Sequence, residues 1–173
     1  MNLTRSITLE DFNHGSAAVP PTLQANAQAM ADLLQQYIDA TGIDVVITSG
    51  YRTPADNANV GGAPSSQHVT ASALDFVPRG TTIIGWATAA LAAQAAGQAG
   101  NFGQMELDPI NGHVHLSLPG GHTNNAIIQQ ADGGYAAWSP GAPVDGTGGV
   151  ASFPTTPPTA AATGEHSSKP CRS

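Results

Sequence analysis

Histidine and aspartate residues of the kind that bind metal ions occur in two segments of the sequence. His68 precedes Asp75 by seven residues, and His113 and His115 lie two apart further along the chain. Catalytic zinc sites use three protein ligands and leave a fourth position open for water. A histidine and an aspartate held close together, with a histidine from another strand, would form such a set. These residue types suggest metal-assisted hydrolysis.

Three other charged side chains could take part in the same chemistry. Arg52 ends the run Ser49-Gly50-Tyr51-Arg52 and supplies a cation. A guanidinium stays charged and offers a fork of donors that suits carboxylates and oxyanions. Glu106 and Asp108 precede the later histidines, and a positioned carboxylate can accept and return a proton. Together these residues favour an anionic substrate.

The later histidines and both carboxylates fall in two segments that we expect to pair as a β-hairpin. The segments are 104–108 and 113–118, joined by the loop 109–112. Side chains alternate between the two faces of a strand, so His113 and His115 share one face. With this loop, Asp108 pairs with His113 and Glu106 pairs with His115. Both carboxylates then lie on the histidine face.

Helices and further strands must position these segments. Apolar residues at three- and four-residue spacing predict a long helix over 22–40, ended by Thr41-Gly42. Other helices are expected at 8–12, from Thr53-Pro54 onward and from 81 to about 98, and strands at 43–48 and within 69–77. We therefore expect an α+β fold in which a small, mainly antiparallel sheet is flanked by helices, with a zinc cleft on one sheet face.

Composition divides the chain and excludes some classes of function. We expect one domain over 1–140 and a flexible or surface-draped tail over 141–173, which is rich in proline, glycine, threonine and alanine. The formal charge of −7, without a lysine or arginine cluster, argues against nucleic-acid binding. Residues 1–7 hold no apolar signal-peptide core, and no apolar run approaches the roughly 18 residues of a membrane span. The single cysteine, Cys171, excludes an internal disulfide.

Several motifs follow one another along the chain: Ile47-Thr48-Ser49-Gly50-Tyr51-Arg52-Thr53-Pro54, Asn57, Val60-Gly61-Gly62-Ala63-Pro64-Ser65-Ser66-Gln67-His68, Ala73 with Asp75, and Val114-His115-Leu116-Ser117. In this order they resemble the zinc D-Ala-D-Ala carboxypeptidase family, and more narrowly its branch in phage and bacterial wall-lytic proteins. The resemblance spans roughly residues 7 to 119 and is specific at family level.

The resemblance implies a role for each candidate residue. It implies zinc ligands at His68, Asp75 and His115, since neutral imidazoles and a carboxylate suit zinc. Arg52 is then the expected clamp for a substrate carboxylate or oxyanion. Ser66 could help to bind the terminal carboxylate of the substrate or hydrogen-bond within its own loop, and His113 could contact substrate or orient water.

The general base has two candidates. The family has a strand that ends in a catalytic glutamate, and the resemblance matches that glutamate with Asp108. The side chain of aspartate is shorter than that of glutamate. The hairpin pairing instead places Glu106 opposite His115. A second departure is Ala71, where the family usually has glycine, because a Cβ there could crowd a backbone turn.

The resemblance implies a zinc-dependent peptidoglycan peptidase that hydrolyses peptide bonds of the stem peptide or cross-link, of D-Ala-D-Ala type. Its expected partners are peptidoglycan stem peptides, and its expected place of action is the cell wall. The alternative is a non-catalytic virion or tail module, structural or wall-binding, that retains the peptidase fold. The missing signal peptide and the tail are compatible with a phage virion component whose tail contacts other virion proteins.

Overall fold

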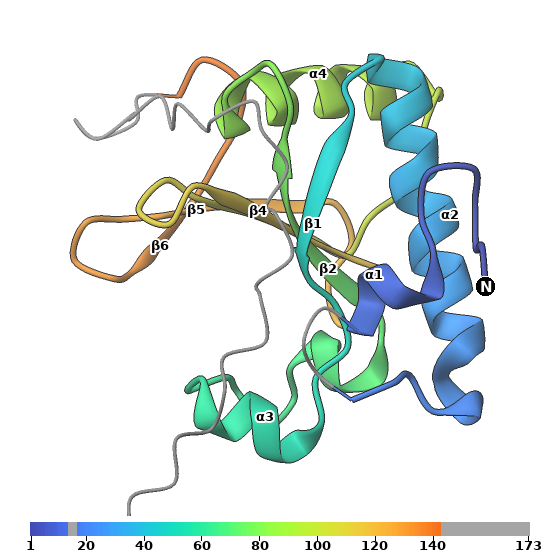
Figure 1. Ribbon diagram of the computed structural model, residues 1–173. Coiled ribbons are helices and arrows are strands. Elements are labelled where there is room, and N and C mark those ends of the chain that lie inside the picture. The colour runs from blue at the N-terminus through green and yellow to red at the C-terminus, as the bar shows by residue number, and fades with distance from the viewer. Residues whose placement is uncertain (14–16, 143–173) are drawn as a thin grey trace, which may run out of the picture.

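The computed structural model describes residues 1–13 and 17–142. One mixed sheet of six strands runs in the order β1-β2-β4-β3-β5-β6 (Figure 1). The strands are β1 (Val45–Ser49), β2 (Ala73–Pro78), β3 (Gln104–Asp108), β4 (His113–Ser117), β5 (Asn125–Gln129) and β6 (Tyr135–Ala137). The helices are α1 (Leu9–Asn13), α2 (Gln24–Thr41), α3 (Pro54–Asn59) and α4 (Ile83–Ala95), with 3₁₀ turns η1 (Pro21–Leu23) and η2 (Gln67–Thr70).

The ends of the helices follow local sequence signals. Helix α2 stops at Gly42, which adopts the left-handed conformation with φ 68° and donates its N–H to Ile38. Thr82 caps α4 by accepting from the Gly85 N–H, and Thr53 caps α3 in the same way from the Asp56 N–H, ahead of a proline at the first helical position. The expected helices are therefore confirmed, with ends shifted by one to three residues.

The two faces of the sheet differ in polarity. One face packs against α2 and α4, which contact each other and the strand β2; in Figure 1, α2 runs down the right of the view and α4 lies across the top. It carries fully buried apolar side chains from the three central strands: Leu74, Phe76, Met105, Leu107, Val114 and Leu116. Because side chains alternate along each strand, the opposite face carries polar residues of the same strands. The candidate site lies on that opposite face.

The strand register confirms the expected hairpin. Asp108 pairs with His113 and Glu106 with His115 across β3 and β4. On its other side, β4 pairs with β2 so that His115 lies opposite Asp75. The sheet is mainly antiparallel as expected, and the exception is the parallel pairing of β3 with β5. Strands β5 and β6 were not expected from the sequence.

The remaining expectations concern the tail and the membrane. Apart from Gly141 and Ala142, the expected tail at 141–173 lies outside the described residues, so the two-part division and the partner role of the tail stay predictions. Within 1–13 and 17–142, no helix has the length and apolar character needed to cross a bilayer.

Candidate metal centre

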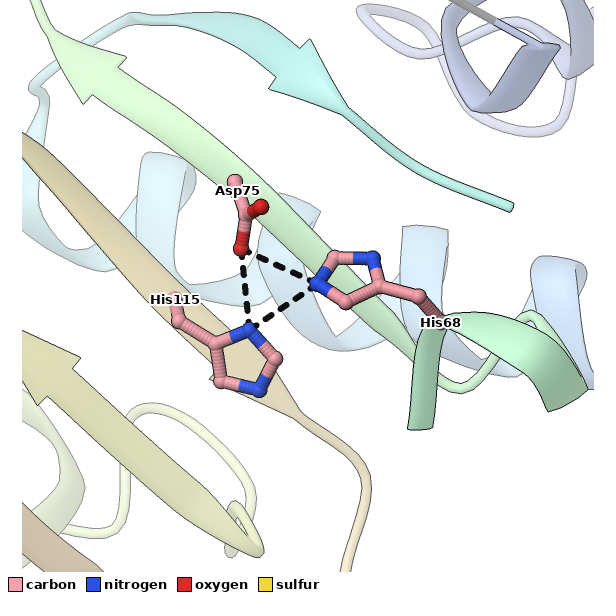
Figure 2. Close-up of side chains that lie close together, drawn as sticks. All are labelled: His68, Asp75 and His115. Atoms are coloured by element: carbon pink, nitrogen blue, oxygen red, sulfur yellow. Dashed lines mark hydrogen bonds and ion pairs between the residues drawn. The ribbon is translucent and has the colours of Figure 1, made fainter. Parts of the chain in front are cut away.

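The sheet and the η2 turn bring His68, Asp75 and His115 together (Figure 2). Asp75 Oδ1 lies 3.1 Å from His68 Nε2 and 2.9 Å from His115 Nδ1. The two imidazole nitrogens lie 3.1 Å from each other. Asp75 and His115 meet because they are cross-strand neighbours on β2 and β4, and η2, which precedes β2, supplies His68. The three atoms form a nearly equilateral triangle.

This triangle fits a zinc ion with three protein ligands. Tetrahedral donors about 2.0–2.1 Å from zinc lie roughly 3.3 Å apart, which is close to the three observed distances. The donor set of two imidazole nitrogens and one carboxylate oxygen is one that catalytic zinc accepts. Only 3% of His68 and 6% of Asp75 is exposed, and buried groups of this kind are normally paired or bound to a metal.

A carbonyl group fixes the orientation of the His68 ring. His68 Nδ1 lies 2.6 Å from the Gly50 carbonyl oxygen, so it carries the proton and donates. Nε2 is then the nitrogen that faces Asp75 and His115, and it is the one that would supply a lone pair to a bound metal. A Cβ on Gly50 would lie 2.5 Å from backbone atoms of Phe12. The glycine is therefore needed so that α1 can approach the end of β1 and leave this carbonyl in place.

Arg52, the residue expected to clamp a substrate carboxylate or oxyanion, is hydrogen-bonded to Asp75 in the structure. Arg52 Nη2 donates to Asp75 Oδ2 at 2.7 Å, while Nη2 and Nε donate to Ser49 Oγ at 2.8 and 3.1 Å. Burial opposes the ionised form of Asp75, but hydrogen bonds and charges of His115 and His68 lower its pKa well below the usual range. Asp75 is therefore anionic at neutral pH, with one oxygen toward the histidines and the other on Arg52.

The two candidate bases lie in different surroundings. The Asp108 carboxylate, 4% exposed, accepts from the backbone N–H groups of Ile110 and Asn111 and from Asn111 Nδ2, at 2.7–2.9 Å. It therefore caps the hairpin turn. Glu106 is half-buried beside His115 and accepts from Gln104 Nε2 at 3.4 Å. Asp108 is thus occupied with the turn, while Glu106 is adjacent to the metal centre.

The two residues expected to contact substrate lie outside the ligand triangle. His113 is opposite Asp108 in the hairpin, with Nδ1 3.7 Å from Asp108 Oδ2. Ser66 is half-buried directly before η2, and its side chain does not cap that turn. Their roles toward substrate stay predictions.

Ala71 takes the left-handed conformation directly after η2, with φ 54° and ψ 30°. Its methyl group is fully buried. An alanine in the left-handed conformation destabilises the fold by roughly 1–2 kcal/mol, and glycine would relieve this strain. Replacing alanine with glycine would also lose about 0.8 kcal/mol of methyl burial and about 0.5–1 kcal/mol through backbone entropy. The ligand triangle forms with alanine in place, so the family's usual glycine is not required for it.

These opposing terms predict the outcome of substitutions at Ala71. Ala71→Gly is expected to change the free energy of unfolding by less than about 1 kcal/mol in urea denaturation, because the terms nearly cancel. Ala71→Val is expected to destabilise by about 2–4 kcal/mol, because a branched residue is both strained at positive φ and too large for the site. A gain of several kcal/mol in Ala71→Gly would contradict this explanation.

A sequence model of the peptidase M15 family matches residues 4–117. The chain belongs to this family. The matched segment contains all three residues of the triangle, together with Arg52, Glu106 and Asp108. A search of curated proteins finds no match. The expected family is thus confirmed, and the phage and wall-lytic branch stays a prediction.

Membership of the M15 family points to a metallopeptidase. M15 peptidases depend on zinc, and the triangle is a possible site for that ion. The family match ends at Ser117, before β5 and β6 begin. The part of the sheet formed by these two strands therefore lies beyond the matched segment.

Gln67 is a residue of the site that the sequence interpretation did not single out. Its Oε1 lies 3.4 Å from His115 Nε2, on the opposite side of the ring from the nitrogen that faces Asp75. Nε2 therefore carries the proton and donates to Gln67. A partner of this kind sets the orientation of a metal-binding histidine. The neighbouring His68 gave the only sequence signal, because Gln67 directly precedes a predicted ligand.

The Gln67 contact predicts a change in zinc affinity. Gln67→Ala is expected to weaken zinc binding by about 10-fold, toward the lower end of the usual range for such partners because the contact is long. Gln67→Glu should retain it, since a carboxylate also accepts from Nε2. Competition with a chromophoric chelator measures both. Unchanged affinity in Gln67→Ala would show that the contact does not orient His115.

Proposed function

We propose that this M15 family member is a zinc-dependent peptidase that hydrolyses peptide bonds of the peptidoglycan stem peptide or cross-link, of D-Ala-D-Ala type. The observation that carries the proposal is the convergence of His68 Nε2, Asp75 Oδ1 and His115 Nδ1 within a chain of the M15 family. When bound there, zinc would supply a Lewis acid that polarises a carbonyl and acidifies water.

The chain's own residues supply binding and proton transfer. Glu106 shares the sheet face of Asp75 and His115, in the same row of cross-strand neighbours. Directly opposed side chains have Cβ atoms about 4.5–5.5 Å apart, so the Glu106 carboxylate is close to the reacting groups. Glu106 takes the proton from the attacking water and returns it to the leaving amine. Asp108 holds the turn that keeps β3 and β4 in this register.

Arg52 contributes through its position beside the ligands. It anchors Asp75 and Ser49 through Nη2 and Nε, and 22% of its side chain is exposed. Its positive charge is therefore next to the centre, where an anionic substrate end or a developing oxyanion is stabilised. In this proposal Arg52 fixes a metal ligand and also favours an anionic substrate.

The proposed activity can be tested with purified muropeptides. Zinc-loaded protein is expected to release D-alanine from stem pentapeptides or to split cross-linked dimers, as detected by mass spectrometry. The activity should be lost in His68→Ala and kept in His122→Ala, which removes an exposed histidine outside the site. Zinc-loaded protein that binds sacculi but cleaves neither linkage would support the non-catalytic wall-binding alternative.

A further inference from the structure

A β-bulge near the end of β1 determines which side chain lies opposite Asp75. Ile47 pairs with Phe76 on β2. Regular pairing would therefore place Thr48, the next residue of β1, opposite Asp75. The register shifts between Ile47 and Ser49, and Ser49 pairs with Asp75 instead. Bulges re-aim side chains and are frequent beside active sites. This one places Ser49 in the cross-strand row of Asp75, on the sheet face of the metal centre.

The Ser49 hydroxyl accepts one whole edge of the Arg52 guanidinium. Ser49 Oγ accepts from Arg52 Nε at 3.1 Å and from Arg52 Nη2 at 2.8 Å. Nη2 also donates to Asp75 Oδ2 at 2.7 Å, so both of its hydrogens are engaged. Among the five N–H groups of a guanidinium, the two on Nη1 have no acceptor within the part of the chain that the structure describes. Nη1 is therefore the nitrogen left for a substrate oxygen.

Ser49 restrains the part of Arg52 that the backbone leaves free. The Arg52 backbone N–H donates to the His68 carbonyl oxygen at 3.2 Å, which fixes the start of the side chain. Arginine is among the side chains that lose the most rotamer freedom when they are ordered. The guanidinium could turn about its single bond to Asp75, whereas the fork on Ser49 defines the guanidinium plane. Ser49 is therefore the second point of attachment.

We propose that Ser49 is a positioning residue that holds the Arg52 guanidinium against Asp75. This inference rests on the proposed function, in which Asp75 is a zinc ligand and Arg52 stabilises an anionic substrate. Loss of an outer partner of a metal ligand lowers metal affinity by about 10–100-fold. Ser49 acts one contact further from the metal, so Ser49→Ala is expected to weaken zinc binding by about 3–10-fold.

The test compares Ser49→Ala with Thr48→Val in the full-length chain. Each substitution removes one hydroxyl from β1, but the Thr48 side chain is exposed and is not an acceptor for Arg52. Competition with a chromophoric chelator should show the stated loss in Ser49→Ala and unchanged zinc affinity in Thr48→Val. Ser49→Thr keeps the hydroxyl and should keep the affinity of wild type. Unchanged affinity in Ser49→Ala, or an equal loss in Thr48→Val, would overturn the proposal.

A double substitution shows whether Ser49 acts through Arg52. In an Arg52→Met background, adding Ser49→Ala should change zinc affinity by less than about 2-fold, because the partner of the hydroxyl is already absent. An equal loss in both backgrounds would mean that Ser49 acts independently of Arg52, and the proposal would then be wrong.

A further measurement depends on neither zinc nor activity. The Arg52 Nε–H gives a proton–nitrogen correlation signal in nuclear magnetic resonance spectra, which is assigned by its absence in Arg52→Met. In zinc-free wild-type protein, the hydrogen bond to Ser49 should protect this hydrogen from exchange with water, and Ser49→Ala should lose the protected signal. A signal that persists unchanged in Ser49→Ala overturns the Ser49–Arg52 contact. If zinc-loaded wild-type protein cleaves no muropeptide, the proposed function fails, and this signal and the zinc affinities still decide separately whether Ser49 positions Arg52.

Discussion

His68→Ala is expected to abolish zinc-dependent hydrolysis and the stabilisation by zinc at the same time. The substitution removes one of three donor atoms and leaves the Gly50 carbonyl without its buried partner. Loss of an outer partner of a ligand costs about 10–100-fold in metal affinity, so loss of the ligand itself should exceed about 100-fold. Zinc at 100 times its dissociation constant stabilises a fold by about 2.7 kcal/mol. Wild-type protein should show the corresponding rise in melting temperature, and His68→Ala should not.

The matched control for this experiment is His113→Ala. His113 also lies on the histidine face of β4, but its ring faces Asp108 rather than the ligand triangle. The control variant should therefore retain one zinc ion per chain and the rise in melting temperature. Circular dichroism verifies that each variant is folded. Stoichiometric zinc in His68→Ala, or loss of zinc in His113→Ala, would show that the ligands have been assigned wrongly.

Arg52→Met is expected to weaken both zinc binding and the fold. Zinc affinity should fall about 10–100-fold, because Arg52 orients the ligand Asp75. Removing one partner of a buried ion pair costs about 3–5 kcal/mol. The Arg52 side chain is 22% exposed, so solvent compensates part of this loss and about 2–3 kcal/mol is expected in urea denaturation.

Arg52→Lys separates the two roles that Arg52 could have. Lysine keeps the positive charge but lacks the fork that reaches Ser49 and Asp75 together. If Arg52 positions Asp75, Arg52→Lys should also bind zinc more weakly than wild type. If Arg52 acts only as a substrate clamp, zinc affinity should stay unchanged in both variants while KM rises. That second pattern would contradict the positioning role.

The sequence predicts the site well where the relevant signals are local. The Glu106–His115 register follows from strand alternation and loop length, and both are properties of one hairpin. Thr53 and Thr82 are recognisable as caps because their signals also lie within a few residues. The pairing of Asp75 with His115 joins distant segments, so it could be expected only from the resemblance.

Other features depend on geometry that no short segment determines. Arg52 was expected to bind substrate, but its contact with Asp75 spans 23 positions of the chain. The Asp108 carboxylate is taken up by the turn, which becomes visible only when the hairpin backbone closes around it. Strands β5 and β6 are short, and the turn signal between them, Asp132-Gly133-Gly134, was the one local cue.

The proposed peptidase activity depends on one zinc ion bound by His68, Asp75 and His115. An anomalous difference map at the zinc absorption edge, from crystals of zinc-loaded protein, tests this most directly. We expect one strong peak about 2.0–2.2 Å from His68 Nε2, Asp75 Oδ1 and His115 Nδ1. A strong peak at other side chains, or no peak at this triangle in zinc-loaded crystals, would contradict it.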